Sequence, residues 1–207
     1  DEVFDILIFA RRDIQTAVIP HFIKKIAAYG FNECKNLKNV IFEPNSELVA
    51  IEKHAFSNSS LNEIIIPQHA VYIGQYAFSE CMQLKSIKFA KNSELQFIDE
   101  SAFFNSSIEN FLIPSLDTRI GEKAFSECKN LKNIDFEDDS NLHFIDQYAF
   151  YKAGINKISI PEKVAHIGLN AFSICSNLQT IDFPENEEYC SIDDELFSFS
   201  AVQNISI

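Results

Sequence analysis

Five cysteines are the residues whose type and spacing could support redox or metal chemistry. Four of them follow one another at steps of 47 residues, and the fifth, Cys190, stands apart; the four are Cys34, Cys81, Cys128 and Cys175. If each repeat adds one strand spacing of about 4.8 Å, cysteines two repeats apart lie about 10 Å apart, whereas disulfides need Cα atoms within about 7 Å. The spacing therefore favours a column of buried thiols that pack as small apolar side chains. Cys190 is the candidate for a reactive or exposed thiol.

The histidines and acidic clusters do not form a catalytic or metal-binding motif. No phosphate-binding glycine loop, zinc-protease motif or paired-cysteine motif occurs. The five histidines share no column of the repeat and lie outside the segments expected to be strands: His21, His54, His69, His143 and His166. The acidic clusters could offer oxygen atoms to calcium, but they lack the alternating aspartates and central glycine of a calcium loop, which favours solvated loops. They are Glu137–Asp139, Glu185–Glu188 and Asp193–Glu195. We predict no catalytic residues, no metal and no cofactor.

The charge of the chain limits its partners. The net charge is −13 and the isoelectric point is near 4.7, whereas nucleic-acid binding needs a basic surface. No apolar run reaches the roughly 18 residues needed to span a membrane, so we expect no membrane insertion. The N-terminus has no signal-peptide pattern, and both ends fall inside repeats, which indicates a piece of a longer array.

These side chains must be positioned by a repeat that runs through the whole chain. Eight phenylalanines recur at alternating steps of 25 and 22 residues, without insertion or deletion: Phe31, Phe56, Phe78, Phe103, Phe125, Phe150, Phe172 and Phe197. A fixed period of this size is typical of stacked-repeat proteins. We therefore expect residues 1–207 to form one solenoid domain.

Each half of the repeat contains one segment that reads as a short strand. Nine six-residue segments carry apolar residues at their first, fourth and sixth positions, and a proline ends most of the shorter halves. They cover residues 14–19, 37–42, 61–66, 84–89, 108–113, 131–136, 155–160, 178–183 and 202–207. Gly74, Gly121 and Gly168 are expected where the chain turns tightly. The prediction is an α/β repeat solenoid, with a parallel sheet of about nine short strands on the concave face. Short helical or 3₁₀ turns, which contain the Ala-Phe pairs, are predicted on the convex side.

The repeat resembles the BspA-like, or treponemal-type, leucine-rich repeats. The resemblance rests on the pattern Ile-Gly-x-x-Ala-Phe-x-x-Cys-x-x-Leu-x-x-Ile, seen at 73–87, 120–134 and 167–181. The alternating shorter form is similar to arrays in surface proteins of parasitic protists. The resemblance implies a cell-surface or secreted protein that adheres to host or matrix proteins without catalysis. An intracellular interaction scaffold, or the repeat region of a protein with catalysis elsewhere, are the alternatives.

The outward positions of the strands vary, and variation is where a ligand surface would lie. The fifth position of the segments is apolar in four of the first five and polar in the last four: Val18, Ile41, Ile65, Lys88, Leu112, Asp135, Ser159, Asp182 and Ser206. An exposed apolar column often marks an interaction site, although β-branched residues also favour strands for their own sake. We predict that a protein partner binds through Val18, Ile41, Ile65, Lys88 and Leu112, flanked by the polar residues Asn39, Glu63 and Asn110.

Two further expectations concern modification and self-association. Asn58, Asn105 and Asn204 begin glycosylation sequons, although Asn-Ser-Ser is also ordinary turn chemistry. The segments 14–19 and 202–207 would expose unpaired strand edges, which favours end-to-end association of two copies.

Overall fold

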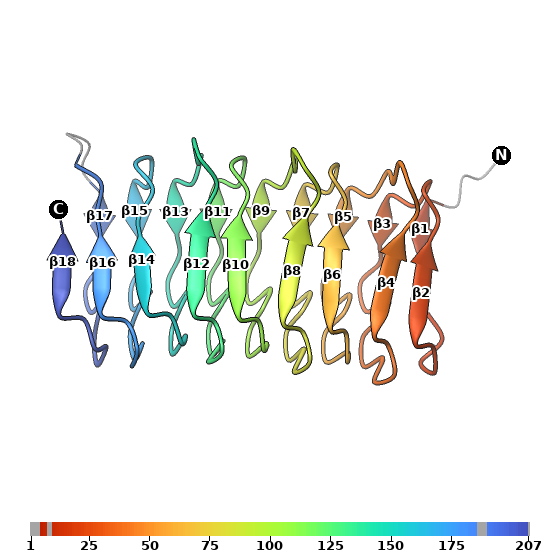
Figure 1. The fold of residues 1–207 in the computed structure, drawn as a ribbon, viewed down its shortest axis with the longest axis horizontal. Helices are drawn as coiled ribbons and strands as arrows, with labels where there is room; N and C mark the ends of the chain where they lie inside the picture. The colour runs from red at the N-terminus through yellow and green to blue at the C-terminus, as the bar shows by residue number, and fades with distance from the viewer. Residues whose placement is uncertain (1–4, 8–9, 186–189, 207) are drawn as a thin grey trace.

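The chain winds into a single flattened solenoid whose turns stack along one axis (Figure 1). The computed structural model describes residues 5–7, 10–185 and 190–206. Each turn contributes one longer strand to one side and one two-residue strand to the other, so two parallel sheets lie back to back with the core between them. Hydrogen-bonded neighbours are always on successive turns.

The longer strands lie within the nine predicted segments, and the placement of these segments is confirmed. They are β2 (Thr16–Ile19), β4 (Asn39–Phe42), β6 (Glu63–Ile66), β8 (Ser86–Phe89), β10 (Asn110–Ile113), β12 (Asn133–Phe136), β14 (Lys157–Ser159), β16 (Thr180–Asp182) and β18 (Asn204–Ser206). Strands β6 to β18 form a seven-stranded sheet, and β2 pairs with β4 in a separate one. Apolar side chains alternate inward along each strand, as a period of two requires.

A second sheet occupies the opposite side of every turn. Its nine two-residue strands are β1 (Ile6–Leu7), β3 (Lys25–Ile26), β5 (Ala50–Ile51), β7 (Tyr72–Ile73), β9 (Phe97–Ile98), β11 (Arg119–Ile120), β13 (Phe144–Ile145), β15 (His166–Ile167) and β17 (Ser191–Ile192). All nine are hydrogen-bonded in one parallel sheet.

The predicted α/β class, with helical turns on the convex side, is wrong. Within the described residues the structure contains no helix, and the Ala-Phe segments form successive β-turns. An α-helix bonds each N–H to the carbonyl four residues earlier in its own segment. Here the N–H of Phe78 donates to the Ala102 carbonyl at 2.7 Å, on the next turn of the solenoid. Tyr76 and Glu80 have positive φ angles, 55° and 56°, which no right-handed helix accommodates.

The phenylalanines form a continuous stack through the core. Successive rings from Phe31 to Phe197 lie 4.9 to 6.2 Å apart between centroids and within 24° of parallel. Seven of the eight are buried, and Phe197 at the end of the stack is half-buried. Because the backbone N–H of each stacked residue also bonds to the next turn, side-chain and backbone ladders run in the same direction.

The predicted column of buried thiols is confirmed. All four stacked cysteines are buried and unpaired, and Cys190 is half-buried. The Sγ of Cys81 donates to the Phe56 carbonyl at 3.1 Å, and that of Cys128 to the Phe103 carbonyl at 3.0 Å. Burial raises the pKa of each of these two thiols to about 11, so they stay protonated at neutral pH.

The glycines serve close packing between turns and not the tight turning that was predicted. No described glycine has a positive φ, so conformational freedom is not what the position requires. A Cβ on Gly168 would lie 2.5 Å from the backbone nitrogen of Gln147, and one on Gly121 would lie 2.7 Å from the carbonyl carbon of Asp99. Glycine is therefore needed because two turns touch backbone to backbone.

Gly168→Ala should lower the free energy of unfolding by about 2 kcal/mol, because the added methyl group must push two turns apart. Gly30→Ala is the matched control, since its Cβ would lie 3.1 Å from the nearest atom and alanine fills the same position in the next repeats. Urea unfolding measures both. Equal effects of the two substitutions would contradict the close-packing explanation.

Candidate protein-binding surface

The outward side of the longer strands carries the predicted binding residues, and we call it the long-strand face. Its apolar members are Val18, Ile41, Ile65 and Leu112, whose exposed fractions are 58, 53, 57 and 45%. Their neighbours in sequence point into the core, because successive side chains of a strand alternate between its two sides. Lys88 occupies the equivalent position of β8 and is also exposed.

The strand register brings these side chains into one row. Val18 pairs with Ile41, Ile65 with Lys88, and Leu112 with Asp135. A second, polar row runs beside it through the predicted flanking residues Asn39, Glu63 and Asn110, which are all exposed. The structure therefore brings all eight predicted residues together on one face.

Polar contacts link neighbouring strands within the second row. The Nδ2 of Asn133 donates to Oδ1 of Asn110 at 2.6 Å. Lys88 and Glu63 form an ion pair at 3.7 Å between side chains that are more than half exposed. Such a pair contributes little to stability and leaves both groups available to a partner.

The row of longer strands is not paired evenly, and grooves open where the pairing fails. No ladder joins β4 to β6, and β12 pairs with β14 only at Asn133 and Lys157. Proline follows both β6 and β14 (Pro67 and Pro161), and it has no N–H to extend the ladder. A groove of about 550 Å³ lies at the first opening and one of about 680 Å³ at the second.

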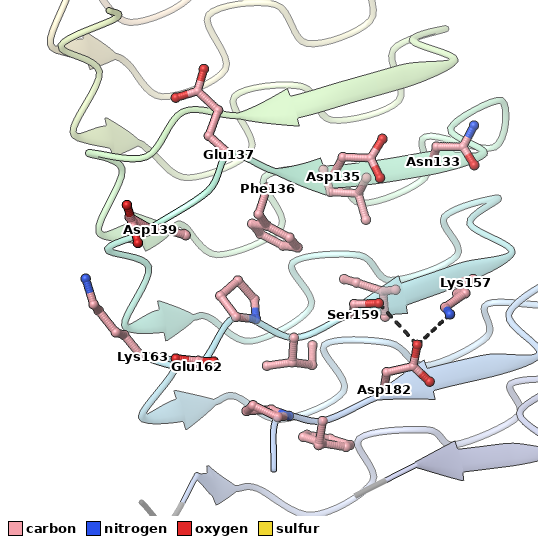
Figure 2. A pocket seen from close by; sticks show the side chains of 17 residues that line it. Asn133, Asp135, Phe136, Glu137, Asp139, Lys157, Ser159, Glu162, Lys163 and Asp182 are labelled. Atoms are coloured by element: carbon pink, nitrogen blue, oxygen red, sulfur yellow. Dashed lines mark hydrogen bonds and ion pairs between the residues drawn. The ribbon is translucent and has the colours of Figure 1, made fainter. Parts of the chain in front are cut away.

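The two grooves are equivalent by repeat but differ in chemistry. Ile41 and Ile65 line the first, whereas Asp135 and Ser159 occupy the same positions in the second, 94 residues later. Figure 2 shows the second groove, where Asp182 accepts from Lys157 at 2.5 Å and from Ser159 at 3.2 Å. The hydrogen bond from Lys157 holds the pKa of Asp182 below its ordinary value. The face therefore changes from apolar to charged along the solenoid.

The histidines lie apart from one another and engage separate partners. His21, His69 and His166 face Glu43, Glu94 and Asp193, respectively. His54 is stacked between Tyr29 and Tyr76, with ring centroids 4.9 Å from each, and burial lowers its pKa. In the described part of the chain, no group of three or more His, Cys, Asp or Glu side chains is placed to hold a metal ion.

The acidic clusters and sequons fall in turns and strands of the solenoid. Asn58 and Asn105 are half-buried with φ angles of 56° and 51°, a conformation that asparagine tolerates, and Asn204 is exposed on β18. Glycosylation of all three stays a prediction. Of the acidic clusters, Glu187 and Glu188 lie outside the described residues. So does Ile207 of the predicted self-association segment.

Two features of the structure escaped the sequence prediction. The first is Asp117, which is fully buried at a position where the other repeats have Ile23, Ala70 and Val164. That interruption of an apolar column is visible in the sequence. The second is the row of exposed side chains on the two-residue strands, which include Phe97 and Phe144. No pattern had indicated that these strands exist.

A flattened solenoid with a ladder at every turn and an exposed strand face defines a leucine-rich-repeat type of protein. This chain belongs to the BspA type leucine rich repeat region family: six copies of the family's repeat match it, over residues 6–128 and 96–207. The predicted family resemblance is thus confirmed. No curated protein matches the chain.

Solved structures show where related folds occur. The pneumococcal vaccine antigen PcpA is 28% identical, with a TM-score of 0.66 over 81% of this chain and 50% of its own. A leucine-rich repeat protein from Bacteroides ovatus is 22% identical, with a TM-score of 0.72 over 95% of this chain and 56% of its own. A leucine rich cell surface protein from Faecalibacterium prausnitzii is 23% identical, with a TM-score of 0.54 over 94% and 61%. The chain therefore spans only 50 to 61% of these structures, and the last two likenesses concern the fold alone.

Among the described residues, no helix is long and apolar enough to cross a membrane.

Proposed function

We propose that this solenoid is a non-enzymatic, protein-binding domain of a cell-surface or secreted protein, and that it adheres to a host or matrix protein through the long-strand face. The observation that carries the proposal is the row of four exposed apolar side chains, Val18, Ile41, Ile65 and Leu112. Large exposed apolar groups in one row are costly in water and are typical of surfaces that a partner covers.

The chemistry around this row fits a protein partner. The polar row through Asn39, Glu63 and Asn110 offers hydrogen-bonding groups at the rim of the apolar row, the arrangement common at protein interfaces. The groove between β4 and β6 adds a concavity of about 550 Å³ next to Ile41 and Ile65. The likeness to a vaccine antigen and to a cell surface protein supports display outside the cell.

The double substitution Ile41→Asp with Ile65→Asp should weaken adhesion by roughly 100-fold, because two central apolar contacts are replaced by charges that must be desolvated. Binding is measured by surface plasmon resonance on a panel of immobilised, purified matrix proteins and on intact host cells by flow cytometry. Thermal unfolding confirms that the variant keeps its fold, as expected for side chains that are half exposed.

Ile192→Asp is the matched control, since Ile192 is 48% exposed but lies on β17 in the opposite sheet. It should leave adhesion unchanged. Equal binding by the wild-type protein and the double variant, or an equal loss with Ile192→Asp, would refute the long-strand face as the binding surface.

A further inference from the structure

The outward side of the two-residue strands carries a repeated pairing of a donor with a carboxylate. In each pair the donor is the first residue of a strand and the acidic residue comes 27 positions later, on the next turn. The four pairs recur every 47 residues: Lys25–Glu52 at 3.7 Å, Tyr72–Asp99 at 2.5 Å, Arg119–Asp146 at 2.6 Å and His166–Asp193 at 3.7 Å. The position 25 residues after each donor lies beside it in the sheet.

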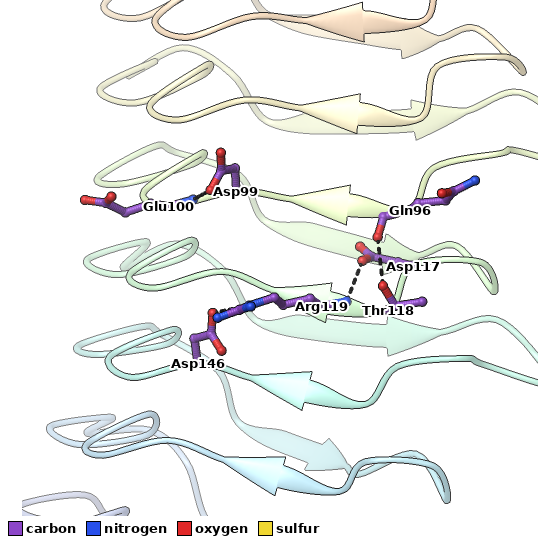
Figure 3. Close-up of polar contacts among 7 residues, drawn as sticks. All are labelled: Gln96, Asp99, Glu100, Asp117, Thr118, Arg119 and Asp146. Carbon is purple, nitrogen blue, oxygen red and sulfur yellow. Dashed lines mark hydrogen bonds and ion pairs between the residues drawn. The ribbon is translucent and has the colours of Figure 1, made fainter.

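One of these pairs already holds a guanidinium group against an aromatic ring. Nε of Arg119 donates to Asp146, and its guanidinium carbon lies 5.9 Å from the centroid of Phe144 (Figure 3). The ring supplies a cation–π contact, and the carboxylate supplies a charge-assisted hydrogen bond. An aromatic ring at the donor position plus 25 and a carboxylate at plus 27 thus form a guanidinium site.

The preceding repeat has the same ring and carboxylate but no cation of its own. Phe97 and Asp99 correspond to Phe144 and Asp146, whereas Tyr72 stands where Arg119 stands one repeat later. The Phe97 side chain is 45% exposed. A cleft of about 430 Å³ opens beside it, and its lining includes Gly121, where a side chain is absent.

The charge of this cleft suits a cation. Its lining contains four carboxylates and one positively charged side chain: Asp99, Glu100, Glu122, Asp146 and Arg119. Arg119 is directed to Asp146, and Glu122 is paired with Lys123. Asp99 accepts from the Tyr72 hydroxyl and from the Glu100 backbone, but a carboxylate has about four acceptor positions, so further donors can bind.

We propose that the cleft binds the guanidinium group of an arginine side chain from a protein partner, stacked on Phe97 and hydrogen-bonded to Asp99. Arginine fits better than lysine because its planar fork can stack on a ring and donate two parallel hydrogen bonds, as a compact ammonium cannot. The site lies on the sheet opposite the long-strand face, so it does not depend on the proposed adhesion function.

The test uses NMR titration of the chain with the peptide Gly-Gly-Arg-Gly-Gly and with the same peptide carrying lysine or uncharged citrulline. The arginine peptide should give saturable shifts at Phe97 and Gly121, the lysine peptide weaker ones, and the citrulline peptide none. Tyr72→Arg would place an internal guanidinium in the site, as Arg119 does one repeat later, and should weaken binding at least roughly tenfold. Phe97→Ala should do the same, and because its ring is half exposed it should leave the fold intact.

Phe22→Ala, a substitution of another exposed phenylalanine away from the cleft, is the matched control and should bind as wild type does. Equal binding of the arginine and citrulline peptides would overturn the proposal, as would wild-type affinity in both Tyr72→Arg and Phe97→Ala. Free arginine that binds as tightly as the peptide would overturn the assignment to a protein partner.

Discussion

Asp117→Val should raise the free energy of unfolding at pH 8 by about 3 kcal/mol, a large gain for one substitution. Asp117 is fully buried, and one of its carboxylate oxygens, Oδ2, has no hydrogen-bond partner. The other oxygen accepts from the Arg119 backbone N–H at 3.1 Å. Burial raises the pKa of this carboxyl group to about 7, so above that pH the folded protein holds a desolvated charge. Valine, which occupies the same position as Val164, removes that cost.

The effect should depend on pH in a direction that burial determines. The folded protein retains a proton that the unfolded chain loses near pH 4, so this group's contribution to stability falls as pH rises from about 4 to 7 and is constant above. The gain from Asp117→Val should therefore shrink as the pH is lowered towards 4. The charged groups on the adjoining turns also titrate, but they are common to both proteins and cancel in the difference. They include Glu137, which accepts from the Ser115 N–H, His143, and Arg119 with Asp146.

Urea unfolding of both proteins at pH 4.5, 6 and 8 measures this difference. Val164→Asp is the reciprocal control: it places a carboxylate in the same column one repeat later and should destabilise the protein at pH 8. A gain from Asp117→Val that is the same at all three pH values would show that the buried carboxyl does not hold its proton.

Phe103→Ala should cost about 4 kcal/mol of unfolding free energy, the range for removing a fully buried aromatic ring. Phe103 contacts three other rings, with centroids 5.5 Å from Phe78, 5.1 Å from Phe125 and 5.1 Å from Phe111. Because each repeat contacts only its neighbours, a cavity in the middle of the stack also weakens the coupling between the two halves. Urea unfolding followed by circular dichroism should show a lower midpoint and a broader transition.

Phe22→Ala provides the comparison, since its ring is 42% exposed and its loss should change stability by less than about 0.5 kcal/mol. If the two variants lost the same stability, the stacked rings would not be the main source of cohesion between turns.

The positions of the longer strands could be predicted because their apolar spacing is the same in every repeat. The burial of the phenylalanines and cysteines followed from their shared columns, and the exposure of Val18, Ile41, Ile65 and Leu112 followed from strand alternation. All of these depend on patterns within one segment, which a single sequence contains.

The remaining features depend on contacts between turns, which the sequence does not display. The Ala-Phe segments were expected to be helical because nothing in their composition shows that the Phe78 N–H donates to Ala102, 24 residues away. Strands of two residues, such as Phe97–Ile98, are too short to produce an alternating pattern. Asp117 could have been noticed, because its column is otherwise apolar, but only a register that includes the loops reveals it.

The hydrogen bonds that join the turns run along the axis of the solenoid, and this arrangement has a mechanical consequence. Tension along the axis loads the bonds of the outermost turn first, so turns are released singly from an end. A turn that occupies about 5 Å of the folded axis holds 22 or 25 residues, which extend to roughly 75–90 Å when pulled straight. Each detached turn therefore lengthens the chain many times over while the rest stays folded. An adhesive strand built in this way could yield under load and keep its remaining contact surface.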